Sequence, residues 1–254
     1  MRERRDVDVI FDGSFEGFLC VLYAYYYEGI APQTIQPAQQ YQAALGAEEY
    51  AVVTDMERAV KVQNAIYTKI SCGAGDLVAR AFLAGEDDKY MTLFHFIVFG
   101  FKVGAAIDNH FQQDFVMRTT HLARRVGGEA HLLKGFCRFA ETAQGIYYCS
   151  ITPKHQVLHM LAHHFCDRMM NLSWVIHDKT HGQAALYNGH ECVFVPVEAS
   201  GMALPMSENE SQIQDLWVAY FQAVAIEERR NRSCQRNLLP MHFRKNMTEF
   251  NKVQ

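Results

Sequence analysis

The sequence predicts an α+β fold, with a mainly helical N-terminal half, a mainly antiparallel sheet of about five strands packed with it, and a long C-terminal helix. Apolar residues recur at helical spacing through most of residues 1–128. After residue 131, short alternating segments separated by turn residues indicate strands. A chain of 254 residues can bury one full core, so we expect a single compact domain that can divide into two lobes, 1–128 and 129–254.

The first half starts with an alternating run from Val7 to Phe11, which suits a short strand. Asp12-Gly13-Ser14 then turns the chain into a helix capped by Asp12 or Ser14. The segment 31–46 contains two prolines and several glutamines, and it predicts a loop. Further helical patterns cover residues 15–27, 56–70 (capped by Thr54 or Asp55), 77–83, 89–101 and 113–126, the last ending at Gly127-Gly128.

The second half alternates short strands with two helices. A turn at 142–144 joins two expected strands, and Asn188-Gly189 is a strong hairpin signal. The expected strands are 135–141, 145–151, 174–178, 184–187 and 192–197. One helix is expected from Pro153 to near Asn171, and a long one from Glu208 or Asn209. The apolar face of the long helix consists of Ile213, Leu216, Trp217, Tyr220, Phe221 and Val224.

Composition excludes several classes of protein. Hydrophobic residues make up 49% and charged residues 20%, which is ordinary for a globular chain. The N-terminus shows no secretory signal, and the longest apolar stretch, 93–101, is about half of a bilayer span, so we expect a buried helix and no membrane. The seven scattered cysteines contain no C-x-x-C pair, which favours free thiols in a reducing cytoplasm. We expect no cofactor.

Charge is distributed unevenly along the chain. The net charge is −4, but residues 229–245 contain six of the 24 basic groups and no acidic residue. This cationic segment can be solvated surface, or it can present arginines to a polyanion. Its apolar residues make it too hydrophobic for a loose tail, and guanidinium groups suit bidentate phosphate contacts. We therefore expect a nucleic-acid interface made of Arg138, Arg229, Arg230, Asn231, Arg232, Arg236, His242, Arg244 and Lys245.

Five of the twelve histidines lie between residues 155 and 178. On a helix, side chains four apart share a face, so His155, His159 and His163 form a column with Cys166 three residues further on. This column is either a minority candidate for a metal site or a polar stripe, and it lacks the Glu of the H-E-x-x-H motif. His164 and Arg168 form a second pair closer to the apolar face, either as a buried polar anchor or as a site.

The segment GGEAHLLKGFCRF contains the remaining candidates for chemistry. If it is extended, Glu129 and His131 point the same way, either as a general acid/base pair or as a contact that stabilises a turn. With His164, Arg168 and Asp178 they form the set of catalytic candidates. FDGSFEGF near the N-terminus is either an anion site at a helix start or an ordinary strand–turn–helix cap. It lacks the spacing of a Walker loop or a dinucleotide fingerprint.

Four motifs together carry a resemblance that covers nearly the whole chain: FDGSFEGFLC, EAHLLKGFCRF, HHFCDRMMNLSWVIHD and RRNRSCQRNLLPMHFRKNMTEF. In this order they resemble a bacterial DNA-metabolism family whose domain of unknown function also occurs fused behind uracil-DNA glycosylase-like domains. Stand-alone members are typically paired with a radical-SAM protein of DNA modification or repair. The resemblance implies a role in DNA repair or metabolism with that partner, but it supplies no known reaction.

The resemblance can be carried over only to matching positions. These are Asp12, Gly13, Ser14 and Gly17; Glu129, His131, Gly135, Arg138 and Phe139; His164, Phe165, Arg168 and Asp178; and Arg230, Asn231, Arg236, Pro240, Arg244 and Lys245. The chain departs from the pattern at Leu132, where the family more often has Arg, and at Ser233-Cys234, where it has a turn with Pro. His159 and His163 are not part of the pattern.

Three functions compete at this point. The first is a DNA-binding accessory protein that delivers substrate to the radical-SAM enzyme. The second is a nuclease or base-processing enzyme that uses Glu129, His131, His164 and Asp178, which requires these side chains to converge. The third is a scaffold whose cationic segment docks on an acidic protein.

Overall fold

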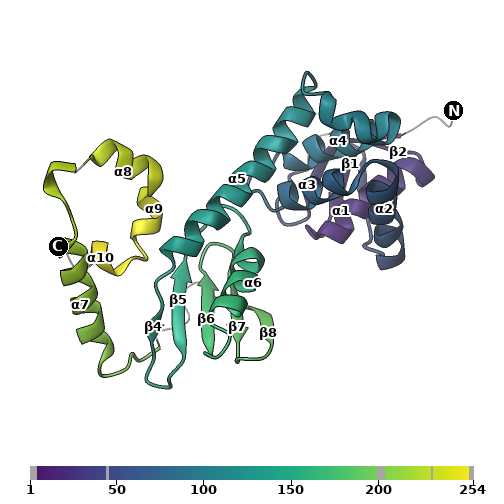
Figure 1. The fold of residues 1–254 in the computed structure, drawn as a ribbon. Coiled ribbons are helices and arrows are strands. Elements are labelled where there is room, and N and C mark those ends of the chain that lie inside the picture. The colour runs from purple at the N-terminus through teal and green to yellow at the C-terminus, as the bar shows by residue number, and fades with distance from the viewer. Residues whose placement is uncertain (1–4, 44–45, 199–203, 230, 252–254) are drawn as a thin grey trace. The chain divides into compact units, whose positions relative to one another are not determined.

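The computed structural model describes residues 5–43, 46–198, 204–229 and 231–251, and it confirms the α+β fold class. The chain forms two compact units, Met1–Gly127 and Gly128–Gln254, which are described here one at a time (Figure 1). The first is mainly helical around a small parallel sheet, and the second is built on a five-stranded sheet.

The first unit is organised around strand β1, which lies in the centre of a three-stranded parallel sheet of order β2-β1-β3. Val7, Val9 and Phe11 of β1 are almost fully buried, as their alternation predicts. The elements are β1 Arg5–Phe11, α1 Phe15–Tyr23, the π-helix η1 Ala24–Glu28, β2 Ile30–Pro37, β3 Glu49–Ala51, α2 Met56–Lys69, α3 Cys72–Phe82, α4 Lys89–Val103, the 3-10 helix η2 Gly104–Asn109, and α5 Asp114–Phe136, which continues into the second unit.

The prediction of a loop over residues 31–46 is wrong, because β2 occupies Ile30–Pro37. Strand β2 is an edge strand, so the missing N–H groups of its two prolines can face away from the ladder. The register also shifts beside Pro32, between Val7 and Asp8 of β1. Burial of Ile30 and Ile35 against the unit's core outweighs the turn-like composition.

Helix α4 is a mostly buried helix of the first unit. Residues Lys89–Asn109 are long and apolar enough to cross a membrane by length and composition, a test that core helices of soluble proteins also pass. Here Leu93, Phe96 and Ile97 are at most 1% exposed and lie in the unit's core. This agrees with the expected buried helix.

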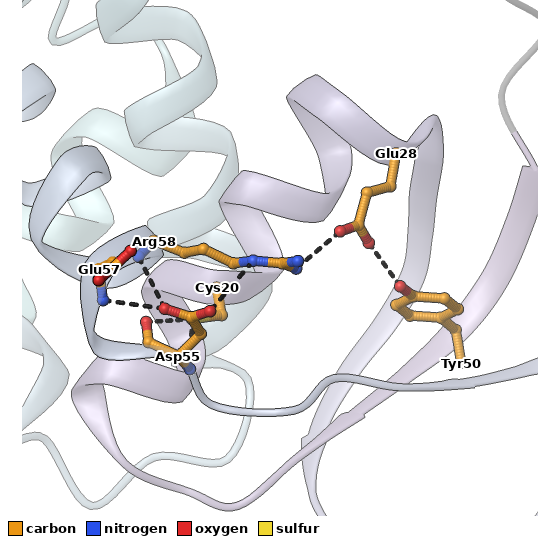
Figure 2. A network of polar contacts seen from close by, with 6 residues as sticks. All are labelled: Cys20, Glu28, Tyr50, Asp55, Glu57 and Arg58. Atoms are coloured by element: carbon orange, nitrogen blue, oxygen red, sulfur yellow. Dashed lines mark hydrogen bonds and ion pairs between the residues drawn. The ribbon is translucent and has the colours of Figure 1, made fainter.

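Two N-caps hold the start of α1 and of α2. The Ser14 hydroxyl accepts the N–H of Gly17, and the Asp55 carboxylate accepts those of Glu57 and Arg58. Figure 2 shows how the second cap extends into a network. The Cys20 thiol lies between the backbone N and O of Asp55, and Arg58 bridges Asp55 and Glu28.

Glu28 completes this network by accepting the Tyr50 hydroxyl at 2.5 Å (Figure 2). The hydrogen bond to Glu28, with burial, raises the pKa of Tyr50. The network therefore joins α1, the end of η1, β3 and α2 by polar contacts.

Helix α5 does not end at Gly127-Gly128 as predicted but continues to Phe136, so the expected strand over 135–141 shrinks to β4, Ala140–Glu141. Val126, Ala130 and Leu133 are at most 3% exposed and lie at helical spacing. Their burial outweighs the helix penalty of two glycines, about 1 kcal/mol each relative to alanine.

The second unit contains a mainly antiparallel sheet of order β4-β5-β6-β7-β8, in which only β5 and β6 are parallel. A four-residue connection at 188–191 joins β7 and β8, and Asn188 accepts the N–H groups of His190 and Glu191 there, which confirms the predicted hairpin. The elements are β5 Tyr147–Ile151, α6 Leu158–Arg168, β6 Trp174–Asp178, β7 Gln183–Tyr187 and β8 Cys192–Pro196.

Helix α6 crosses between the parallel strands β5 and β6 and packs on β6 and β7 (Figure 1). Trp174 is fully buried, stacks on Tyr187 with ring centroids 5.2 Å apart, and contacts Phe165 of α6 edge-on. The helix is shorter at both ends than the predicted span from Pro153 to Asn171. His155 therefore lies before the helix, so the predicted four-member column does not form.

The C-terminal part of the second unit is a series of helices, the first and longest being the expected one with Asn209 at its N-cap position. Phe243 is 3% exposed and docks the C-terminal end of the cationic segment, but Leu238 and Met241, which were also expected to dock it, are 64% and 60% exposed. The elements are α7 Glu210–Ala223, η3 Glu227–Arg229, α8 Arg232–Leu238, α9 Met241–Arg244 and α10 Thr248–Asn251.

Candidate functional site

The cationic segment 229–245 presents basic side chains that no carboxylate neutralises. Arg229, Arg236 and Lys245 are exposed, and within the described parts of the chain none of the three forms an ion pair. In contrast, Arg5 and Arg118 in the first unit each pair with a carboxylate. The segment therefore offers free cationic groups to an external anion.

The other predicted members of the interface differ in what the structure shows. Arg244 is half-buried, with its guanidinium 4.9 Å from the ring centroid of Phe250. Asn231 caps α8 by accepting the N–H of Cys234 at 2.9 Å. Arg230 lies outside the described residues, and only the backbone of Arg232, at the start of α8, is described.

Two hydrogen bonds of Asn246 and a longer charged contact of His242 anchor the cationic segment to the rest of the unit. Asn246, directly after it, donates to the Thr152 hydroxyl at 3.0 Å and accepts from the Ser150 hydroxyl at 3.2 Å. The Nε2 atom of His242, which is exposed, lies 3.8 Å from a carboxylate oxygen of Glu129. These contacts hold the segment beside β5.

Arg138 does not share the exposure of the cationic segment. Its guanidinium donates to Glu249 at 2.7 and 3.3 Å and to the Gly135 and Cys137 carbonyls, and it lies 5.3 Å from the centroid of the Trp217 ring. Burial raises the pKa of Glu249, but hydrogen bonds from Arg138 and Trp217 outweigh it and hold the pKa below its usual value. The Arg138 guanidinium is bound by residues of the second unit itself, so we exclude Arg138 from the nucleic-acid interface.

Glu129 and His131 do not form the acid/base pair that an extended segment would allow. Both lie on α5, where residues two apart point to different sides. The Glu129 carboxylate is 9% exposed and accepts the backbone N–H of Lys154 at 2.9 Å and of His155 at 2.7 Å. His131 is exposed. Glu129 therefore acts as a bridge between α5 and the chain entering α6.

His164 and Arg168 lie on the last turns of α6, near Lys134 of α5. Burial lowers the pKa of His164, and the positive charges of Lys134 and Arg168 lower it further, whereas the Asp167 charge raises it. Lys134 and Arg168 are exposed, as is His131 one turn before Lys134. Residues matching two separate motifs thus meet in a second cationic group, His131, Lys134, His164 and Arg168.

The Asp178 carboxylate stabilises the turn that follows β6. It is 1% exposed, and its carboxylate accepts the N–H of Thr180 at 3.0 Å, the N–H of His181 at 3.1 Å and a contact with His181 Nδ1 at 2.6 Å. No hydrogen bond or ion pair joins any two of the five catalytic candidates, all of which are described residues. The convergence that an enzyme of this kind requires is not seen.

The four residues of the candidate metal site, His155, His159, His163 and Cys166, are also dispersed. His155 is 3% exposed, and its backbone N–H is held by Glu129. The His159 ring packs on Phe194 with centroids 3.8 Å apart, whereas His163 is exposed. The Cys166 thiol contacts Cys192 across to β8, and burial, together with Cys166, raises the pKa of Cys192 to about 11. Among the described residues, no group of three or more His, Cys, Asp and Glu side chains could hold a metal ion.

One buried polar pair was missed by sequence reasoning. The Tyr148 hydroxyl and His177 Nδ1 are 2.8 Å apart on neighbouring strands, and burial and the Lys179 charge lower the pKa of His177. His177 is 1% exposed, and its Nε2 has no hydrogen-bond partner among the residues that the structure describes. Strand alternation places His177 and Asp178 on opposite faces of β6, and this alternation was the sequence signal that could have identified His177 as a separate candidate.

The first motif of the chain forms a cap. Asp12 accepts the Ser14 N–H at 2.9 Å, the Ser14 hydroxyl at 2.6 Å and the Thr54 hydroxyl at 2.8 Å. Burial raises the pKa of Asp12, but these hydrogen bonds outweigh it and lower the pKa overall. The carboxylate lies where an anion would bind, at the start of α1, so the geometry supports the cap over the anion site.

A family model described as a domain of unknown function, DUF4130, matches residues 87–249, well over half of the chain. The chain belongs to the DUF4130 family. The matched DUF4130 region contains the cationic segment and the second cationic group, whereas the Asp12 motif precedes it. No curated protein and no solved structure matches the chain. The DUF4130 description carries no activity, so function has to be argued from the side chains.

Proposed function

We propose that this DUF4130 protein binds nucleic acid through residues 229–245 and acts as an accessory protein in DNA repair or metabolism. The observation that carries the proposal is the exposure of Arg229, Arg236 and Lys245 without a carboxylate partner among the described residues. Phosphate groups are the counterpart that such side chains suit, because contacts to the backbone of DNA release condensed counterions. The rest of the chain is acidic overall, so it would repel DNA elsewhere and orient it toward this segment.

The C-terminal end of the cationic segment is docked by Phe243 and by the residues that follow it, which supports binding over a purely solvated surface. Phe243 and Met247 are buried, and Asn246 is hydrogen-bonded to Ser150 and Thr152. A segment held in this way loses less conformational entropy when it binds than a free tail does. The amide and imidazole groups of Gln235, Asn237 and His242, all exposed, add donors suited to phosphate or base edges.

The second cationic group extends the proposed interface on the same unit. Its members are His131, Lys134, His164 and Arg168, of which Lys134 and Arg168 are exposed cationic side chains. Burial, and then the charges of Lys134 and Arg168, lower the pKa of His164, which favours the neutral imidazole with one nitrogen that donates and one that accepts a hydrogen bond.

The proposal includes a protein partner, a radical-SAM enzyme of DNA modification or repair. The support for this partner is the resemblance of the four sequence motifs, which implies the association but identifies no reaction. In this arrangement the DUF4130 protein holds the nucleic acid and the partner performs the chemistry.

The test compares two triple variants of equal charge change. The first is Arg229→Ala, Arg236→Ala and Lys245→Ala, and the control is Lys69→Ala, Lys102→Ala and Arg124→Ala, which are exposed and outside the segment. Binding to a short fluorescein-labelled DNA, single-stranded or duplex, is followed by fluorescence anisotropy between about 50 and 200 mM salt.

We expect the slope of log affinity against log salt for duplex DNA to fall by about 3 in the first variant, because three phosphate contacts are lost. The control should keep the wild-type slope. Equal behaviour of the two variants would exclude the proposed interface. Wild-type protein that binds no DNA would leave the scaffold function in its place.

A further inference from the structure

Helix α7 carries a stripe of large apolar side chains that the second unit leaves exposed. Every member is between 38% and 70% exposed, and Leu216 is the most exposed of them. The stripe consists of Ile213, Leu216, Trp217, Tyr220, Phe221 and Val224. A contiguous apolar surface of this kind on a globular protein usually marks an interaction site.

The exposure does not come from a detached helix, because α7 is fastened at several points. Glu210, at its first turn, is 5% exposed and accepts the backbone N–H of Glu141 at 2.9 Å. Trp217 donates its indole N–H to Glu249 at 3.1 Å, and the Phe221 ring packs against that of Phe250. Trp217 and Phe221, the two least exposed members of the stripe, therefore also hold the helix on its unit, and the other four members are more than half exposed.

The spacing of the stripe is the same in both directions along the helix. Successive members are separated by 3, 1, 3, 1 and 3 residues, so the pattern is symmetric about a point between Val218 and Ala219. If a second α7 lies antiparallel on this point, side chains of matching kind face each other. Ile213 then meets Val224, Leu216 meets Phe221, and Trp217 meets Tyr220.

The charges at the two ends of α7 favour the antiparallel direction. Residues 204–226 contain Glu208, Glu210 and Asp215 and no basic residue. The cationic segment starts at Arg229, after Glu227 and Glu228. An antiparallel pair brings the acidic start of one helix toward the cationic segment of the other, whereas a parallel pair places like charges together.

The area of the stripe also fits an interface between two copies. From the exposed fractions and the usual size of such side chains, it offers on the order of 700 Å² per copy, close to the share that each partner contributes to a standard stable interface. Two-fold pairing is self-complementary and closes, so it buries the stripe without leading to a filament.

We propose that the occupant of the α7 stripe is a second copy of this chain, bound through an antiparallel, two-fold pair of α7 helices. This inference is independent of nucleic-acid binding, and it is tested in the absence of DNA. It also places the cationic segments of the two copies on one assembly.

The first experiment measures the mass of the full chain in solution by light scattering after size exclusion, over a wide concentration range. We expect twice the chain mass of 29.1 kDa for the wild type. Leu216→Asp should give the monomer, and the matched control Leu172→Asp, at an apolar residue 40% exposed outside the stripe, should remain a dimer. A monomeric wild type would mean that something else covers the stripe, and it overturns the proposal, as does a Leu216→Asp dimer.

The second experiment tests the direction of the pair by cross-linking through introduced cysteines, in a background with Cys72→Ser and Cys234→Ser, because both thiols are exposed. Tyr220→Cys lies near the two-fold point and should cross-link to its own copy. Ile213→Cys should not, because residue 213 of one helix lies about 16 Å along the axis from residue 213 of the other, at 1.5 Å per residue. Efficient cross-linking at Ile213 but not at Tyr220 overturns the antiparallel arrangement.

Discussion

Substitution by alanine is expected to have opposite effects on stability at two glycines in helices of this chain. Gly17 lies in the first turn of α1, and Gly128 lies inside α5. A Cβ atom at Gly17 would lie 2.9 Å from the Thr54 hydroxyl oxygen, 3.0 Å from that of Ser14 and closer still to an Asp12 carboxylate oxygen. A Cβ atom at Gly128 would meet nothing within 4 Å.

The magnitudes follow from these contacts. Gly128→Ala gains about 1 kcal/mol of helix propensity with no steric cost, so we expect the free energy of unfolding to rise by about that amount. Gly17→Ala has the same gain in principle but displaces oxygens of three hydrogen bonds that converge on Asp12, each contributing about 1 kcal/mol or more. The net expectation for Gly17→Ala is a loss of about 2 kcal/mol.

The assay is urea and thermal unfolding of the full chain followed by circular dichroism. We expect the midpoint of thermal unfolding to rise by about 2–4 °C for Gly128→Ala and to fall for Gly17→Ala. The Asp12→Ala background isolates the cause, because the cost of Gly17→Ala should largely disappear once its main clash is gone. A stabilising Gly17→Ala, or an unchanged cost in that background, would refute the reasoning.

Three further predictions concern Arg138, Glu249 and Cys192 of the second unit. Arg138→Ala should lower the free energy of unfolding by about 3 kcal/mol, because it leaves the Glu249 carboxylate, 2% exposed, without its cation. The pKa of Glu249 is lowered in the folded state, so its contribution to stability is full above its usual pKa of 4.5 and is lost as the pH falls through the folded value. Glu249→Gln should remove this dependence of the free energy of unfolding on pH, measured by acid denaturation. Alkylation by iodoacetamide near pH 8, mapped by mass spectrometry, should be much slower at Cys192 than at exposed Cys72 and Cys234, because the Cys192 pKa is raised to about 11. Equal rates at the three thiols would contradict this.

Local sequence patterns predicted the elements whose cause is local. Ser14 and Asp55 cap their helices because the side-chain oxygen and its N–H partners lie within three residues of each other. Trp174–Asp178 was predicted with the observed bounds, because a short run of apolar residues next to turn signals is typical of a buried strand. The hairpin at Asn188 depends on the same kind of short-range chemistry.

The candidate site was predicted only in part. The cationic segment was found from its charge, and the structure places it on short helices docked by Phe243. Arg138 was included in the interface for its charge alone, because its partner Glu249 lies 111 residues away and the sequence does not show that the two pair. The Tyr148–His177 pair was missed because its partners are on different strands.

The sequence by itself determined the α+β class, most helix starts, the hairpin and the location of the cationic segment, since each follows from periodicity, capping or composition within a short window. Only the tertiary structure decided that β2 is a strand despite its prolines, that α5 runs through two glycines, and that Glu129 and Asp178 serve backbone groups. It also decided that the apolar face of α7 stays exposed. These outcomes depend on which distant residues become neighbours, and burial and hydrogen bonding across such contacts outweigh local propensities of about 1 kcal/mol.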